Sequence, residues 1–305
     1  MNQGMQLDRK QSFRYVALCW GLLAIHKHEG KLAGKPIISI TTDFGENDHF
    51  VGVMKGVILS INPDAMVVDI NHQVNSFDIF DGAYSISQSY HVFPPGTIHV
   101  VVVDPGVGSE RRPILVQSKD YRFVAPDNGV LSMVYEREER VEVRQVTAEH
   151  FFRKPVSNTF HGRDIFAPVA AWLSRGMEVE KFGAIITDYA RFTSVRPKSE
   201  DAFTINGVVI KVDKFGNIIT NIAPRDVPQI FGQDPPPFRI RINGHEITRI
   251  HESFAAGEAS ELFAVVGSSG FVEICTNRGS AAKALNVNRG AAVEVKLAAQ
   301  PAETA

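Results

Sequence analysis

The pattern of apolar and polar positions changes near residue 190 and divides the chain into two regions. In the first region, short apolar runs alternate with segments whose apolar residues follow helical spacing. Residues 37–42 and 65–70 are rich in β-branched residues and end at polar turns, which predicts buried strands. Residues 48–61 have the spacing of an amphipathic helix and stop before Asn62-Pro63, a turn signal.

The alternation continues to about residue 175. Residues 80–91 predict another helix, and residues 97–104 (TIHVVVVD) form an almost uninterrupted apolar run. Such a run is typical of a strand that is covered on both faces. Because strands alternate with helices, this region predicts βαβ units and a mostly parallel central sheet.

Beyond a polar, proline-containing stretch at 193–201, the periodicity becomes that of strands. Seven short β-rich runs follow, separated by Asn-Gly, Gly-Ser-Ser-Gly and proline-containing turns. Many short strands with turn signals between them are typical of a sandwich or a small barrel. We therefore predict an N-terminal extension at 1–34, an α/β domain at 35–192 with a mostly parallel central sheet, and an all-β domain at 202–298.

The N-terminal extension contains an apolar run at 15–25 (YVALCWGLLAI) with Lys10 and Arg14 ahead of it. This order matches the core of a secretory signal, although no clear A-x-A cleavage site follows. A short extra helix, or a start codon placed upstream of the true domain, are the other interpretations. Because the run is well short of the ~20 residues that span a bilayer, we predict no membrane partner.

Composition narrows the range of partners. The 305 residues are 44% hydrophobic, which is enough for a substantial core, and the formal net charge is −2. Such a chain lacks the basic character of nucleic-acid-binding domains, so we predict no nucleic-acid partner. Its two cysteines, Cys19 and Cys275, exclude a disulfide framework and a cysteine-based zinc cluster. A soluble enzyme or a small-molecule-binding protein remains.

Four polar clusters occur in the first region, at positions where strands are predicted to end or helices to begin. They are TTDFG with Asp43, DPGVGSERR with Asp104, Arg111 and Arg112, APDNG with Asp127 and Asn128, and NTFHGRDIFAP with His161, Arg163 and Asp164. Open α/β sheets bind ligands beyond the carboxyl ends of their strands. Each cluster also has a purely structural interpretation: Asp43 as a helix cap, Asp104 and Asp127 as turn formers, and His161 as a surface histidine. Four such clusters in one domain favour a functional site.

The clusters follow no known cofactor motif. Side chains of a type that suits Mg²⁺ or Mn²⁺ occur in and beside them, namely Asp43, Asp48, His49, His161 and Asp164. No metal-binding spacing, phosphate loop or G-x-S-x-G nucleophile motif is present in the sequence. We therefore predict no metal, and a metal-dependent hydrolase stays an alternative.

Taken in order, TTDFG, INPDAMVVDINHQV, FPPGTIHVVVVDPGVGSERR, APDNG, FHGRDIFAPVAA and VDKFGNIITNI resemble the S-adenosyl-L-methionine hydroxide adenosyltransferases. This family shares a superfamily with fluorinating and chlorinating adenosyl enzymes. The resemblance runs from about residue 37 to about residue 295. It implies an α/β domain followed by a β-barrel, and a homotrimer with its sites between subunits. It also implies hydrolysis of S-adenosyl-L-methionine to adenosine and L-methionine, with no cofactor.

The resemblance further implies roles for individual residues. Asp104, Arg111 and His161 would position and activate the attacking water, and which of them takes the proton is left open. The residues that would bind the substrate are Asp43 at the ribose hydroxyls, Asp213 at the methionine ammonium, Phe215 and Asn217 at the adenine, Ser268 and Ser269 at the methionine carboxylate, and Glu273 near the ligand.

Two other functions would use the same substrate: a halogenase that forms 5′-halo-5′-deoxyadenosine, and a non-catalytic adenosine or S-adenosylmethionine sensor. Halide capture needs a dry pocket of donors without competing carboxylates. Because the sequence keeps Asp104, Arg111 and His161, and has only a short span between DPGVG and APDNG, water is the expected nucleophile. The scarcity of cysteine fits a reducing cytoplasm, where we expect the protein to act, with export left open by the N-terminal run.

Overall fold

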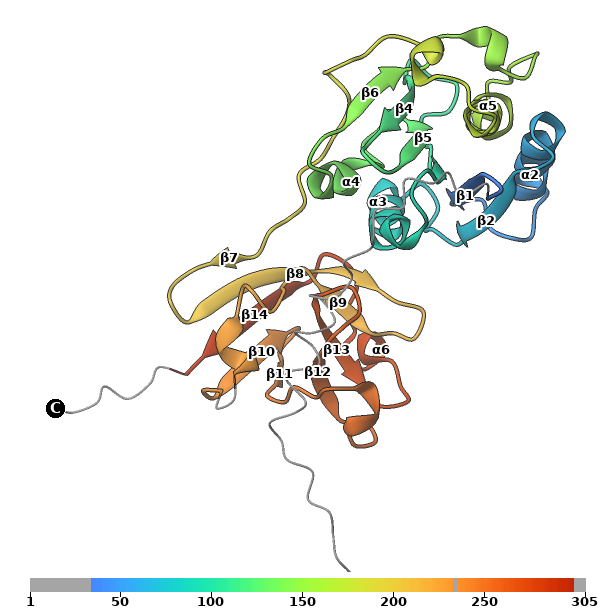
Figure 1. Ribbon diagram of the computed structural model, residues 1–305. Helices are drawn as coiled ribbons and strands as arrows, with labels where there is room; N and C mark the ends of the chain where they lie inside the picture. Colours follow the sequence, from blue (N-terminus) through green and yellow to red (C-terminus); the bar gives the residue numbers. More distant parts are fainter. Residues whose placement is uncertain (1–33, 233–234, 299–305) are drawn as a thin grey trace, which may run out of the picture. The chain divides into compact units, whose positions relative to one another are not determined.

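The computed structural model describes residues 34–232 and 235–298 (Figure 1). The apolar run at 15–25 lies outside the described residues. From Pro36 onward the chain forms one compact unit that contains both sheets. The domain limits of 35–192 and 202–298 stay predictions.

The N-terminal region is built on a six-stranded sheet with the order β2-β1-β3-β5-β4-β6. The strands are β1 (Ile37–Thr42), β2 (Met66–Asn71), β3 (Ile98–Val102), β4 (Pro113–Gln117), β5 (Arg122–Pro126) and β6 (Glu142–Gln145). The pairs β1–β2, β1–β3 and β3–β5 are parallel, which confirms the predicted mostly parallel sheet. Strand β4 is antiparallel to both of its neighbours. For β5 the reason is that only four residues separate the two strands, and a parallel crossover needs about a dozen.

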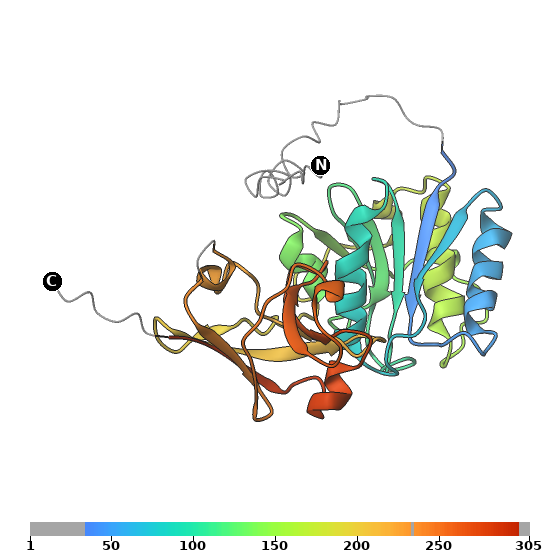
Figure 2. The same ribbon diagram turned by 90° about the horizontal axis from the view of Figure 1, so that it is seen from below.

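Helices cover both faces of this sheet. Helices α2 (Phe50–Ile61) and α5 (Ala167–Ser174) lie on one face, and α3 (Ile79–Ser89) and α4 (Ser132–Arg137) lie on the other (Figure 2). Along β3, Val100 and Val102 pack in the core shared with α2 and α5, whereas Val101 packs in the core shared with α3 and α4. Alternate side chains of β3 therefore enter two cores, which explains the continuous apolar run at 97–104.

The C-terminal region is a second sheet whose neighbouring strands are antiparallel, with the order β11-β10-β14-β8-β9-β13-β12 and β7 beside β8. The strands are β7 (Lys198–Ser199), β8 (Thr204–Val212), β9 (Ile218–Thr220), β10 (Phe238–Ile242), β11 (His245–Ile247), β12 (Leu262–Val266), β13 (Val272–Thr276) and β14 (Ala292–Leu297). A bridge between Ile250 and Ala264 connects the two ends of the sheet. The region is thus a nearly closed barrel, and the predicted fold class is confirmed.

Short elements complete the described chain. They are α6 (Ala281–Leu285), the π-helix η3 (Gly162–Phe166) and 3₁₀ turns at Tyr90–Val92, Glu149–Phe151, Val179–Phe182, Pro228–Phe231 and Phe254–Ala256. In the ranges 34–232 and 235–298, no helix combines the length and the apolar character needed to cross a bilayer.

Candidate active site

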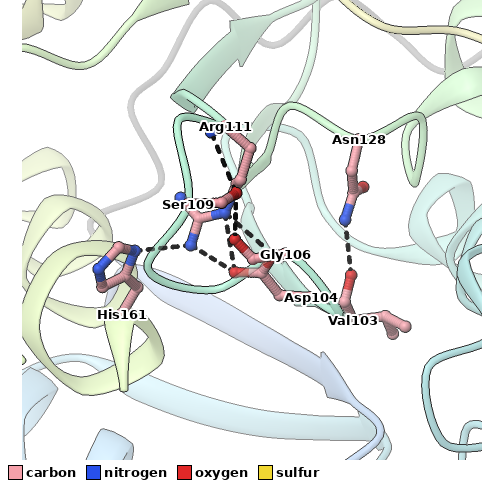
Figure 3. Close-up of polar contacts among 7 residues, drawn as sticks. All are labelled: Val103, Asp104, Gly106, Ser109, Arg111, Asn128 and His161. Carbon is pink, nitrogen blue, oxygen red and sulfur yellow. Dashed lines mark hydrogen bonds and ion pairs between the residues drawn. The ribbon is translucent and has the colours of Figure 1, made fainter. Parts of the chain in front are cut away.

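An ion pair between Asp104 and Arg111 lies in the loop that joins β3 to β4 (Figure 3). Arg111 Nε donates to both Asp104 carboxylate oxygens at 2.9 Å, and Arg111 Nη2 also donates to Oδ2. The side chains of Asp104 and Arg111 are only 4% and 9% exposed. A two-pronged arginine–carboxylate contact of this kind fixes both position and orientation.

The loop folds back on itself because its glycines permit a tight turn. Val107 N donates to Asp104 O at 3.2 Å, and the Ser109 hydroxyl donates to Gly106 O at 2.6 Å. Gly108 has φ +78°, and a Cβ at that position would lie 2.2 Å from Asn158 O. Only glycine fits there, so the loop does contain a tight turn. The same turn brings together the two charged side chains.

His161 contacts the other side of the Arg111 guanidinium. Arg111 Nη2 lies 2.6 Å from His161 Nδ1 (Figure 3). Because a guanidinium has only donors, Nδ1 must accept, and the proton of a neutral imidazole is then on Nε2. Burial lowers the pKa of His161 and the positive charge of Arg111 lowers it further, against the opposing effect of Asp104 and Asp164. His161 is therefore neutral near pH 7, with a fixed tautomer.

A buried carboxylate anchors the segment that carries His161. Asp164 lies in the π-helix η3 and is fully buried; its Oδ1 accepts from Arg163 Nε at 2.7 Å and its Oδ2 from Ser157 N at 2.9 Å. Arg153 Nη1 approaches Oδ1 at 3.3 Å. Through these contacts, Asp164 fixes the position of the chain on both sides of His161.

Asp43 lies beyond the end of β1, and its environment contradicts the helix-cap interpretation. Helix α2 begins at Phe50 with His49 at its N-cap, whereas Asp43 Oδ2 accepts from Phe77 N at 2.8 Å. Burial raises the pKa of Asp43; the Phe77 N–H opposes this, and the negative charge of Asp104 adds to it. Because β1 and β3 are parallel neighbours, Asp43 and Asp104 both follow the carboxyl edge of the sheet.

Phe77 belongs to none of the four polar clusters in the sequence. This residue is 71% exposed and has φ +65°, a conformation that an aromatic side chain rarely adopts. Its N–H nevertheless holds the Asp43 carboxylate. No sequence signal predicts a positive φ at a phenylalanine, so only the structure could find it.

The candidate residues of the barrel form a second group. In the turn between β8 and β9, Asp213 Oδ1 accepts from the N–H groups of Phe215 and Asn217, and Oδ2 accepts from Asn217 Nδ2 at 3.0 Å. The Phe215 side chain is left 68% exposed. Between β12 and β13, Ser269 Oγ donates to Glu273 Oε1 at 3.3 Å.

The charges of this second group interact. Burial raises the pKa of Glu273; the Ser269 hydroxyl opposes this shift, while the negative charge of Asp213 adds to it. Ser268 is exposed next to Ser269. Two neighbouring carboxylates, one of them 6% exposed, make this part of the barrel favourable for a cation.

The structure therefore brings the predicted residues together in two separate groups. The first contains Asp43, Asp104, Arg111 and His161, and the second contains Asp213, Phe215, Asn217, Ser268, Ser269 and Glu273. Within the described part of the chain, no hydrogen bond or ion pair joins a member of one group to a member of the other. Among those same residues, no three His, Cys, Asp or Glu side chains cluster as metal ligands would.

Comparisons with known proteins cover both groups. The family described as SAM hydroxide adenosyltransferase N-terminal domain matches residues 38–183, and the corresponding C-terminal domain family matches residues 207–294. A curated relative from Methanocaldococcus jannaschii, named (R)-S-adenosyl-L-methionine hydrolase, is 36% identical over 83% of this chain and 92% of its own length. A fluorinase from Actinoplanes sp. is 26% identical over 87% of this chain and 99% of its own length.

A solved structure shows the same fold. The crystal structure of an uncharacterized conserved protein from Thermotoga maritima superposes with a TM-score of 0.79 and 38% sequence identity. The match covers 85% of this chain and 99% of the Thermotoga chain.

The anchoring role of Asp164 leads to a pH-dependent prediction for Asp164→Asn. Burial acts to raise the pKa of Asp164, but hydrogen bonds from Arg163 and Ser157 outweigh it and hold that pKa below its ordinary value. The carboxylate therefore stabilises the fold above its ordinary pKa, and this contribution disappears as pH falls through the native pKa.

At pH 7 we expect Asp164→Asn to lower the free energy of unfolding by about 1–3 kcal/mol, measured by urea denaturation. The difference from wild type should shrink below about pH 4, where carboxylates begin to protonate. Asp120→Asn, at an exposed position, is the matched control and should leave stability unchanged. A difference that stays constant down to pH 3 would contradict the anchoring role.

Proposed function

The chain belongs to the S-adenosyl-L-methionine hydroxide adenosyltransferase family, and from this premise we propose that it hydrolyses S-adenosyl-L-methionine to adenosine and L-methionine. The observation that carries the proposal is the buried contact of Arg111 with Asp104 on one side and His161 on the other. All three side chains lie within the matched N-terminal region, at the edge of the sheet where α/β folds bind ligands.

The reaction needs few chemical groups. The water oxygen forms a bond to the ribose C5′ carbon as the C5′–S bond breaks, and that bond's electron pair passes to sulfur. Because the sulfonium leaves as a neutral thioether, no general acid is required. The remaining tasks are to place the water in line with the C5′–S bond and to remove its proton, and positioning contributes a large part of such a rate enhancement.

The hydrogen bonding supports Asp104 as the proton acceptor. Arg111 has no acceptor atom, and His161 Nδ1 already accepts from Arg111, which leaves His161 with a donating Nε2–H. The Asp104 carboxylate is the member of the trio with remaining lone pairs. A carboxylate is basic enough for this step, because the water becomes strongly acidic as its oxygen bonds to carbon. In this proposal His161 Nε2–H orients the water and Arg111 holds both partners.

The remaining residues bind the substrate. Asp43 accepts hydrogen bonds from the ribose hydroxyls, Asp213 pairs with the methionine ammonium, and Phe215 and Asn217 contact the adenine. Ser268 and Ser269 contact the methionine carboxylate, with Glu273 near the cationic end of the ligand. The proposal includes no cofactor and no metal.

We also propose a homotrimer, which the family resemblance implies. The residues assigned to the substrate lie at the sheet edge and in the barrel, and we assign the substrate to a site between the sheet edge of one subunit and the barrel of the next. We also assign the activity to the cytoplasm, whose reducing conditions fit the two cysteines, and cell fractionation checks this assignment.

A halogenase is the second candidate, because fluorinases are among the relatives at 26% identity. The buried Asp104 carboxylate argues against it, since a halide next to a carboxylate loses its hydration and gains a repulsive neighbour.

The assay that tests the proposal incubates purified protein with S-adenosyl-L-methionine, with and without chloride or fluoride. Both sulfonium epimers are compared, because the named relatives act on the (R) form. We expect adenosine and L-methionine in equal amounts by chromatography, at a rate independent of halide. Halide-dependent 5′-halo-5′-deoxyadenosine would establish the halogenase instead. Tight binding without product would indicate a sensor.

Variants of the trio test the assigned roles. We expect Asp104→Ala, Arg111→Ala and His161→Ala each to lower kcat about 10²–10⁴-fold while keeping the wild-type circular dichroism spectrum. The matched controls Asp64→Ala, Arg239→Ala and His245→Ala change exposed residues and should retain full activity. Wild-type rates in all three trio variants would exclude the assignment.

The pH dependence of the wild-type rate tests the protonation state of His161. Because the pKa of His161 is lowered, wild-type activity should persist as pH falls through 6.5.

Subunit mixing tests the shared site. Arg111→Ala removes a residue of the first group and Asn217→Ala removes one of the second, so each variant alone should be inactive or weak. If the site lies between subunits, hybrid trimers contain intact sites, and mixing followed by subunit exchange should restore part of the activity. A monomeric mass by light scattering, or no restoration after verified exchange, would contradict the homotrimer.

A further inference from the structure

The turn after β5 contacts both ends of the loop that carries Asp104 and Arg111. Asn128 Nδ2 donates to Val103 O at 2.9 Å, one residue before Asp104 (Figure 3). Asp127 Oδ2 accepts from Arg112 Nε at 2.9 Å and Nη2 at 2.6 Å, one residue after Arg111. Two adjacent side chains therefore hold the residues that flank the ion pair.

Strand order explains why one turn can reach both places. Strand β5 is parallel to β3, so the end of β5 lies beside the end of β3, where Val103 follows. Strand β5 is antiparallel to β4, with Pro113 paired to Pro126. The end of β5 therefore also lies beside the start of β4, which directly follows Arg112. Because β5 is between β3 and β4, its final turn is adjacent to both ends of the loop.

Every polar side-chain atom of this turn has at least one protein partner. Asp127 is 4% exposed, its Oδ1 accepts from Ala190 N at 2.7 Å, and its own N–H donates to Arg112 O at 2.8 Å. Asn128 Oδ1 accepts from Val130 N at 3.1 Å, which fixes the direction of its amide. Each polar atom of these two side chains therefore already has a protein partner, and we assign both residues an indirect effect on the reaction.

We infer that Asp127 and Asn128 are positioning residues that set the geometry of the Asp104–Arg111 pair. The inference rests on the proposed function, because it concerns the same reaction. Arg111 must meet Asp104 and His161 at once, and a shift of about 1 Å in one end of the loop breaks that alignment. The turn holds this alignment because Asn128 contacts one end of the loop and Asp127 contacts the other.

Asn128→Ala tests the inference, since it removes the donor to Val103 O together with the acceptor of the local Val130 N–H. We expect kcat to fall about 10–100-fold with KM within about threefold of wild type. In an Arg111→Ala background the same substitution should cause little further loss, because the pair that it positions is already absent. Wild-type kcat in Asn128→Ala, or equal losses in both backgrounds, would overturn the inference.

Two controls separate positioning from general stability. Asp188→Asn removes the negative charge of the 75% exposed partner of Arg112 and should retain wild-type kcat. Asn243→Ala makes the same substitution at a barrel turn, where the side chain donates to Leu285 O at 2.7 Å, and should lower stability without lowering kcat. A fall of kcat in Asn243→Ala equal to that in Asn128→Ala would show that lost stability explains both.

Titration of His161 by NMR supplies a readout that is independent of turnover. Arg111 contributes to the lowered pKa of His161, so displacement of Arg111 in Asn128→Ala should raise that pKa relative to wild type. If wild-type protein shows no turnover of S-adenosyl-L-methionine, the proposed function fails and this titration alone decides the inference. An unchanged pKa of His161 in a folded Asn128→Ala variant would then overturn it.

Discussion

The site depends on the Arg111 guanidinium, a cation that can only donate hydrogen bonds and that lies almost entirely out of solvent. A buried charge is stable only when its surroundings supply acceptors and an opposite charge. Asp104 supplies both at one edge of the group, and His161 Nδ1 accepts at another. The Phe166 ring lies 5.2 Å from the guanidinium carbon, within the range of a cation–π contact. Arg111 thereby fixes the orientation of the carboxylate and the tautomer of the imidazole together.

Meeting this requirement constrains the fold around the site. Asp104 and Arg111 are brought together by a glycine-dependent loop, whereas His161 approaches from a π-helix anchored by the buried Asp164. The antiparallel β4 returns the chain so that the loop starts and ends beside the same turn. A sheet with only parallel neighbours would place the start of β4 at the opposite edge, far from the end of β3. The one reversed strand is thus part of how the site is built.

The barrel supplies a different kind of chemistry. Its carboxylates, Asp213 and Glu273, repel each other enough to add to the raised pKa of Glu273, and a cation between them relieves that repulsion. The sheet edge instead contains a neutral imidazole and a compensated ion pair. This division matches a substrate with a cationic amino-acid end and a reacting ribose carbon. It also explains why neither region alone contains all the residues that the family resemblance implies.

The amino-acid sequence by itself determined the fold class and the elements with a clear apolar period, because apolar periodicity reports burial and each strand or helix has a local period. The run at 97–104 was recognisable as a doubly covered strand, and the alternating runs after residue 201 as barrel strands. The motifs also supplied Asp104, Arg111 and His161 as candidates.

Only the tertiary structure decided how these residues meet. In the structure, β4 is antiparallel to its neighbours, and the Phe77 N–H donates to Asp43. Arg111 Nη2 contacts His161 Nδ1, and Asp127 accepts from Arg112. The three side-chain contacts each join residues that are at least 15 positions apart in the chain. Periodicity along the chain reports which face of an element is buried, but strand order and direction determine which buried groups become neighbours.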